Sequence, residues 1–167
     1  MKLDPSIQII NNSHIYAKDA KKIIEPNIWN TYKKICVVRN SWDWQMSLYF
    51  YSKNLKSHHQ HNIIKDMNIK EYLLWRRDND LHQQQEFILD DNEECLIDNI
   101  FKFENLTMEL IVYFKQNYNL NVIPFLPSKK INTSSRDSDY TKYYNEETKN
   151  ILLEMHKPDI DRYGFTF

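Results

Sequence analysis

The chain has 167 residues, which is enough for one domain with a sizeable hydrophobic core. Hydrophobic residues make up 41% of it and aromatic residues 14%, which excludes the composition of a disordered protein. The formal net charge of -1 gives no overall attraction to nucleic acid or to an anionic membrane surface. We therefore expect a single domain over residues 1–167, no nucleic-acid partner, and only a local site for any anion.

The cysteine content and the start of the chain bear on the compartment. Cys36 and Cys95 are too few for a disulfide framework, and Cys36 lies in an apolar run where a buried side chain is expected. No run of about 18 apolar residues is present that could span a membrane. Asp4 and Pro5 interrupt the place where an export signal needs its apolar run, which predicts a cytoplasmic protein. The Golgi lumen stays open as the location if a membrane anchor precedes this chain.

Gly164 is the only glycine in the chain. Glycine-rich phosphate loops need positive φ angles and a close approach of the backbone to the ligand. The dinucleotide-binding fingerprint and the Walker loop are both absent, which also disfavours a kinase-like phosphotransferase. An anion would have to be held by side chains and helix ends.

Short apolar runs alternate with amphipathic stretches along the chain. We expect helices over residues 16–25, 26–32, 41–54, 64–77, 106–117 and 145–156, and strands over residues 35–38, 87–89 and 97–103. The polar residues 55–62 are expected to form a loop. This alternation favours an α/β fold in which a parallel sheet is flanked by helices.

The clearest strand is the β-branched run at residues 35–38, a pattern typical of a strand that is buried on both faces. Asn40 is a good N-cap for the next helix, and Asp43 is placed to complete an arrangement like a capping box. The buried face of that helix is predicted to consist of Trp42, Met46, Tyr49 and Phe50.

Arg39 lies where ligands commonly bind in α/β sheets, beyond the carboxyl end of a strand. The following helix turns its positive end to the same place. Ser47 comes about two helical turns later and can reach a phosphate that lies alongside the helix. The spacing fits equally well with an Arg39 that pairs with a carboxylate such as Asp43 and a Ser47 that only packs.

Several segments resemble one family. The segment VVRNSWDWQMSLYF resembles "(V/F)VRNPWDRxVSxYY" of the sulfotransferases that use 3′-phosphoadenosine 5′-phosphosulfate (PAPS) as donor. HIYAKDAKKIIEPNIWNTYKK resembles the lead-in "HAxAxxIRxxIGxxIWxSYxK", and IDNIFKFENL resembles "vDfIgRfEnL". The segment from INTSSRD to the end resembles the closing part of the family, "N-S-R-x-x-Y-x-x-YY … D-x-x-x-FGY-x-F". The four matches occur in the order of the family and cover nearly the whole chain from about residue 12.

The resemblance implies a sulfotransferase fold of the P-loop NTPase type and transfer of a sulfuryl group from PAPS to a hydroxyl group. It points to the carbohydrate and uronyl 2-O-sulfotransferases, and so to a glycan acceptor, with PAP as the second product and no metal. Arg39 and Ser47 match the residues that hold the 3′-phosphate of the donor.

Two further residues are site candidates. His14 matches by position the catalytic base of the uronyl 2-O-sulfotransferase branch, and an ordinary histidine pKa suits that role. Arg136 would close over the nucleotide. The alternatives are that His14 is a loop residue that binds a backbone carbonyl and that Arg136 is a surface charge.

The chain departs from the family pattern in three places. Ser41 replaces a proline at the helix start, and Trp44 replaces an arginine near the phosphate site. No segment resembles the loop "PKTGGTS", which holds the 5′-phosphosulfate, so the first strand, loop and helix are expected to be missing. The explanations, in order of preference, are a fragment of a longer product, a second chain that supplies the loop, and an inactive relative that remains a nucleotide-binding or interaction module.

Three other groups of residues have both a functional and a structural interpretation. Glu104 could be a base or a substrate contact, although a salt bridge or a helix cap is favoured. His58, His59 and His61 lack the partners of a metal site and are expected to lie in a solvated loop. Tyr140, Tyr143 and Tyr144 are expected to pack in the core or a loop, and one of them could lie against adenine.

Overall fold

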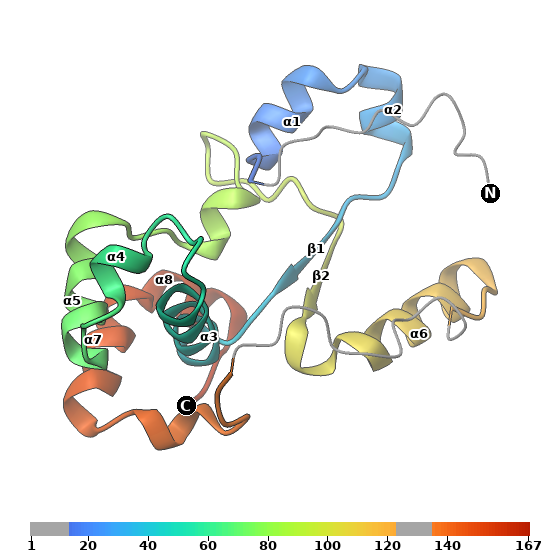
Figure 1. The fold of residues 1–167 in the computed structure, drawn as a ribbon. Helices are drawn as coiled ribbons and strands as arrows, with labels where there is room; N and C mark the ends of the chain where they lie inside the picture. The colour runs from blue at the N-terminus through green and yellow to red at the C-terminus, as the bar shows by residue number, and fades with distance from the viewer. Residues whose placement is uncertain (1–13, 123–134) are drawn as a thin grey trace. The chain divides into compact units, whose positions relative to one another are not determined.

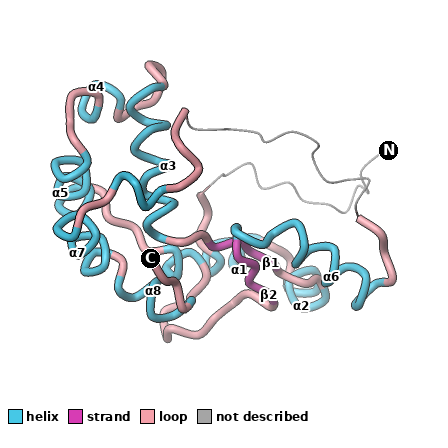
Figure 2. Tube along the Cα trace, turned by 90° about the horizontal axis from the view of Figure 1, so that it is seen from below, coloured by secondary structure: helices cyan, strands magenta, loops and turns pink. Residues whose placement is uncertain are grey.

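The structure is a computed structural model that describes residues 14–122 and 135–167. The residues before His14, which include Asp4 and Pro5, and the first four residues of the INTSSRD segment lie outside the described residues. The chain is mostly helical, with a small parallel sheet of two strands flanked by helices (Figures 1 and 2). The expected α/β class with a parallel sheet is therefore confirmed at this level.

The bounds of the elements agree with most of the expected ones. The α-helices of the described residues are α1 (Ala17–Ile23), α2 (Pro26–Thr31), α3 (Ser41–Asn54), α4 (His61–Ile64), α5 (Ile69–Asn79), α6 (Leu106–Tyr118), α7 (Glu146–Met155) and α8 (Lys157–Tyr163). The strands are β1 (Ile35–Val38) and β2 (Asn99–Lys102), and short 3-10 helices are η1 (Gln84–Phe87), η2 (Phe103–Asn105) and η4 (Tyr140–Tyr143).

The chain divides into two compact units. The first comprises Met1–Cys36 and Gln84–Ile100, and the second comprises Val37–Gln83 and Phe101–Phe167. The border between them passes through both strands. That residues 1–167 form a single domain stays a prediction.

In the first unit, residues 87–89 do not form the expected edge strand. The helix η1 ends at Phe87, and Leu89 forms only an isolated antiparallel bridge with Cys95. The reason is the turn that follows, where the Asp90 carboxylate accepts hydrogen bonds from the backbone of Asn92 and Glu94 at 2.9 Å. The chain reverses there before a strand can extend.

Asp98 fixes the entry to strand β1 within the first unit. Its Oδ2 accepts the backbone N–H of Lys34 at 2.8 Å and lies 2.9 Å from the Lys34 ammonium group. The backbone hydrogen bond and the ion pair lower the pKa of Asp98 to about 2. Asp98 therefore stays ionised at neutral pH and holds Lys34 at the start of the strand.

Cys36 is half-buried rather than fully buried, and both cysteines are free thiols. Burial, followed by the nearby Cys95, raises the pKa of the Cys36 thiol to about 11. The thiolate is scarcely populated at neutral pH, so Cys36 behaves as a small packing residue, as expected.

Strand β1 is not buried on both faces, and that expectation was wrong. Ile35 and Val37 share one face and are 44% and 48% exposed, whereas Val38 is buried. A two-stranded sheet needs a layer of other elements on each face to be buried. The described residues do not supply such a layer over Ile35 and Val37.

The core of the second unit is built around α3, which contacts α4, α7 and η4, while α5 packs against α7. Trp42, Met46 and Tyr49 of α3 are buried as expected, and Phe50 is half-buried. Helices α4, α5 and α7 add Ile64, Tyr72, Leu73, Leu152 and Met155 to this core, and Phe101, Ile160 of α8 and Phe165 are also buried.

A chain of buried polar side chains crosses this core. The Tyr72 hydroxyl donates to Gln45 Oε1 at 3.0 Å, so the amide nitrogen of Gln45 faces His156 Nε2, also at 3.0 Å. An amide nitrogen can only donate, so His156 Nε2 accepts and the ring proton lies on Nδ1. Asp159 is 3.8 Å from that nitrogen. The chain of contacts links α5, α3 and the junction of α7 with α8.

The helix expected over residues 145–156 is α7, and the sequence did not predict the helix that follows it, α8. The single glycine explains where α8 stops, because Gly164 adopts the left-handed conformation with φ of 61° at its C-terminus. A side chain at this position would strain the backbone. Gly164 thus serves a helix end rather than a ligand loop.

Candidate anion-binding site at the start of helix α3

Asn40 caps helix α3, as expected, and is buried. Its Oδ1 accepts the backbone N–H of Trp42 at 3.0 Å, which satisfies a donor at the start of the helix. Its Nδ2 donates to the Thr166 carbonyl at 2.8 Å and to the Tyr140 hydroxyl at 3.3 Å. The Asn40 side chain therefore caps the helix at the strand–helix junction and joins this junction to the C-terminal segment.

Glu104 takes the place expected for Asp43 in the cap. Its carboxylate accepts the backbone N–H of Asn40 at 2.7 Å, so the capping-box interpretation of Asp43 was wrong. Of the roles considered for Glu104, the structure supports that of a cap. A carboxylate 64 residues away in the sequence could not be identified from local spacing.

Asp43 instead binds two arginines. Arg39 Nε donates to Asp43 Oδ2 at 2.6 Å, and Arg136 Nη2 donates to Asp43 Oδ1. The guanidinium group of Arg39 also lies over the ring of Phe103, 4.4 Å from its centre. Arg39 therefore pairs with Asp43, as in the alternative interpretation, and Arg136 joins the same carboxylate.

Arg136 is not an ordinary surface charge. Its side chain is only 6% exposed, and besides Asp43 it binds the carbonyl oxygen of Asp137 at 3.0 Å. Its buried Nε has no hydrogen-bond partner among the described residues. Two guanidinium groups therefore meet on one carboxylate in a largely buried place.

Ser47 lies on the same side of α3 as Asp43, one helical turn further along. It is half-buried. Phe50, the next residue on that side, packs against Tyr143, with 4.8 Å between the centres of the two rings. The structure thus brings Arg39 and Arg136 together and places Ser47 on the side of the helix that they face.

His14 is an exposed residue of the first unit, whereas Arg39, Ser47 and Arg136 belong to the second. Its role as a base stays a prediction.

The tyrosines near the C-terminus pack as a cluster. The rings of Trp42, Tyr140 and Tyr144 all lie within 6 Å of the ring of Phe167. The pKa of Tyr140 is raised by burial and then by the charges of nearby carboxylates, Asp43 foremost among them. Packing is therefore the role that the structure gives these tyrosines, and Tyr140 borders the arginine site.

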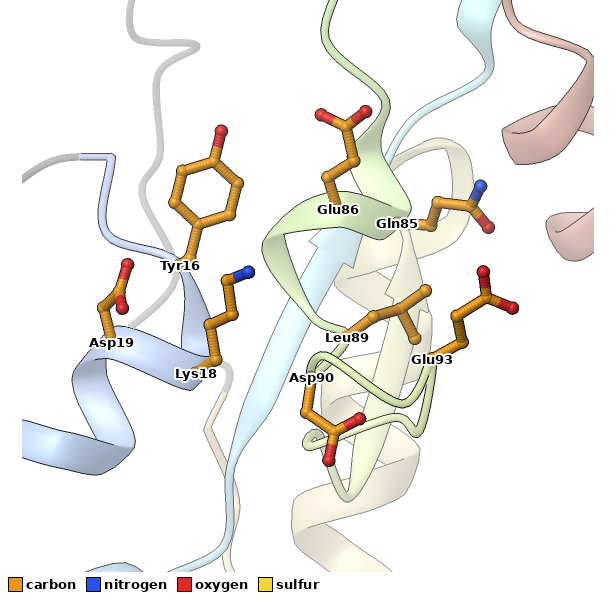
Figure 3. A pocket seen from close by; sticks show the side chains of 8 residues that line it. All are labelled: Tyr16, Lys18, Asp19, Gln85, Glu86, Leu89, Asp90 and Glu93. Carbon is orange, nitrogen blue, oxygen red and sulfur yellow. The ribbon is translucent and has the colours of Figure 1, made fainter.

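An open cavity lies in the first unit (Figure 3). It has a volume of about 500 Å³ and is lined by Tyr16, Lys18, Asp19, Gln85, Glu86, Leu89, Asp90 and Glu93. Its acidic side chains outnumber its single basic one, and Lys18 forms an ion pair with Asp91 at 2.8 Å. This lining would repel a phosphate, and it includes none of the predicted site residues.

The histidines at 58, 59 and 61 lie in the turn before helix α4 and at its first residue. The ring centres of His58 and His59 are 4.4 Å apart. Burial and then the neighbouring histidines lower the pKa of His58. Nowhere in residues 14–122 and 135–167 do three or more His, Cys, Asp or Glu side chains gather in a way that could hold a metal ion.

The chain matches no protein-family model, and comparison with curated proteins and with solved structures gave no match either. Within the described residues, every helix is too short or too polar to cross a membrane.

The cap at Asn40 can be tested by substitution. We expect Asn40→Ala to lower the free energy of unfolding by about 2–3 kcal/mol, because it removes a helix cap and two hydrogen bonds to the C-terminal part of the chain. Asn68→Ala is the matched control, since Asn68 caps α5 in an exposed, purely local capping box. It should cost about 1 kcal/mol. Urea denaturation measures both, and equal losses would contradict the linking role of Asn40.

Proposed function

We propose that this chain is a sulfotransferase-like domain, with a fold of the P-loop NTPase type, that holds the 3′-phosphate of PAPS with Arg39, Ser47 and Arg136. In the active form it transfers the sulfuryl group to a hydroxyl of an acceptor, a glycan by resemblance. The observation that carries the proposal is the meeting of Arg39 and Arg136 on one carboxylate at the start of α3.

Charge and geometry favour a phosphate as the ligand of these arginines. A guanidinium group presents parallel N–H donors that match two oxygens of a phosphate. The start of α3 adds the positive end of a helix of 14 residues. The side chains of Arg39 and Arg136 are 22% and 6% exposed, so they would attract an anion in a place with little water.

The reaction requires few groups from the protein. The bond between sulfur and the donor's phosphate oxygen breaks, a bond between sulfur and the acceptor oxygen forms, and PAP leaves. The protein must align the reactants, stabilise the charge on the leaving phosphate, and accept the proton of the hydroxyl. In this proposal Arg39, Ser47 and Arg136 align the donor, and His14 accepts the proton.

The sulfate end of the donor needs a further segment. Since nothing in this sequence resembles the PKTGGTS loop, that loop would come from a longer product of the same gene or from a second chain. A second candidate function is a nucleotide-binding or interaction module without catalysis. It is favoured by the same missing loop and by the two carboxylates, Asp43 and Glu104, that occupy the anion-binding donors.

Donor binding can be measured by calorimetry with 3′,5′-adenosine bisphosphate. We expect Arg39→Ala to weaken binding about 10- to 100-fold, because it removes a charge-assisted contact to the phosphate. Arg77→Ala is the control, since Arg77 is an exposed arginine of the same unit that pairs with its neighbour Asp78. It should leave the affinity unchanged. No binding of the wild type at millimolar ligand would contradict both the donor site and the enzyme.

Catalysis is tested with the chain assembled with a PKTGGTS-type segment and labelled PAPS, over a panel of glycans. We expect His14→Ala to lower kcat about 100-fold or more, because the hydroxyl proton loses its acceptor. His59→Ala, at another exposed histidine, should have no effect. Normal turnover by His14→Ala would remove it as the base, and nucleotide binding without transfer to any glycan would favour the non-catalytic module.

A further inference from the structure

We infer that the Asp43 carboxylate is a stand-in for the ligand's phosphate. It holds Arg136 on helix α3 while no ligand is bound, and it moves aside when an anion binds. The inference rests on the proposed function, because it concerns the same two arginines, and it adds a positioning residue that is not itself a ligand contact.

The geometry around Asp43 resembles that of a bound anion. Each of its two oxygens receives one guanidinium group, Arg39 on Oδ2 and Arg136 on Oδ1. The side chains are 22%, 13% and 6% exposed for Arg39, Asp43 and Arg136, so water can replace few of these contacts. A tetrahedral phosphate offers the same pair of oxygens and further ones beyond them.

Arg136 needs such a partner. It belongs to a segment 93 residues away in the sequence, and its buried Nε makes no hydrogen bond within the described residues. Without Asp43, two guanidinium groups would lie close together with no carboxylate between them. That arrangement is costly when water is scarce, and it would loosen Arg136 from α3.

The same contact must oppose ligand binding. A negative carboxylate repels an arriving phosphate and competes with it for both arginines. Binding therefore exchanges one anion for another, and part of the attraction of the two arginines is used to move Asp43 aside. The exchange keeps Arg136 on α3 in the empty and the filled site, while it makes the release of a product phosphate easier.

Removal of the carboxylate gives two opposite effects that a purely structural salt bridge would not combine. In Asp43→Asn the midpoint of thermal unfolding should fall without ligand, since Arg39 and Arg136 lose the carboxylate that they share. Its affinity for 3′,5′-adenosine bisphosphate should rise about tenfold, equivalent to one charge-assisted contact, since the ligand no longer competes. Saturating ligand should return the midpoint to near that of the liganded wild type.

Two further variants make the measurement specific. Asp137→Asn removes a neighbouring carboxylate that pairs with Lys142 and should leave the affinity nearly unchanged. Arg136→Gln leaves Asp43 with Arg39 alone, so it should weaken binding and reduce the gain from Asp43→Asn in the double variant, because Asp43 then competes for one arginine only. If Asp43→Asn does not fold without ligand, refolding on addition of the bisphosphate is the expected result, and failure to refold contradicts the inference.

The outcomes separate the inference from the proposed function. If the wild type binds the bisphosphate through Arg39 and Asp43→Asn binds it equally or more weakly, the stand-in role is wrong and the donor site stands. If Asp137→Asn raises the affinity as much as Asp43→Asn, the effect is one of overall charge and the inference is also wrong. If no variant binds, the proposed donor site fails, and the inference with it.

Discussion

The Asn40 side chain connects three parts of the second unit through its hydrogen bonds. It caps α3 at Trp42, reaches the Thr166 carbonyl near the end of the chain, and contacts the Tyr140 hydroxyl in η4. Its own backbone N–H is taken by Glu104, next to strand β2. Because these contacts converge at the point where β1 passes into α3, the position of Arg39, one residue earlier, depends on them.

The candidate site has a simple electrostatic balance. Two arginines meet on Asp43 at the start of a helix, and the carboxylate of Glu104 binds the backbone there, in a chain whose formal net charge is -1. The proposed anion site is therefore local, as the net charge predicts, and it would depend on side chains and a helix start, since the sequence has no glycine-rich loop. The acidic cavity of the first unit has the opposite character, which makes the start of α3 the better place for a phosphate.

The sequence was sufficient where local chemistry decides the structure. The β-branched run at residues 35–38, the cap at Asn40 and the spacing of Trp42, Met46 and Tyr49 predict β1, the start of α3 and its buried face correctly. Each of these depends on residues within a few positions of one another. Most of the other helices follow from the same short-range periodicity, but α8 was missed and the helix expected over residues 64–77 is interrupted, since α4 ends at Ile64 and α5 begins at Ile69.

The sequence was insufficient where distant residues compete for the same group. Asp43 was expected to bind the backbone at Asn40, but Glu104 binds there and Asp43 binds Arg136. The choice between these pairings depends on which carboxylates the fold brings to the start of α3, and no spacing rule contains that information. The exposure of Ile35 and Val37 on β1 was missed for a related reason. An apolar strand sequence shows that the strand could be buried, but it does not show which other elements cover it.

Arg39 and Arg136 are proposed to form one anion-binding site on α3. Nitrogen NMR of the arginine Nε–H groups tests it directly, and the buried Nε of Arg136 should give a signal protected from exchange. Addition of 3′,5′-adenosine bisphosphate should shift the Nε signals of Arg39 and Arg136 and the amide of Ser47 together, with one shared affinity. Shifts confined to the cavity around Tyr16 and Glu86, with both arginine signals unchanged at saturation, would contradict it.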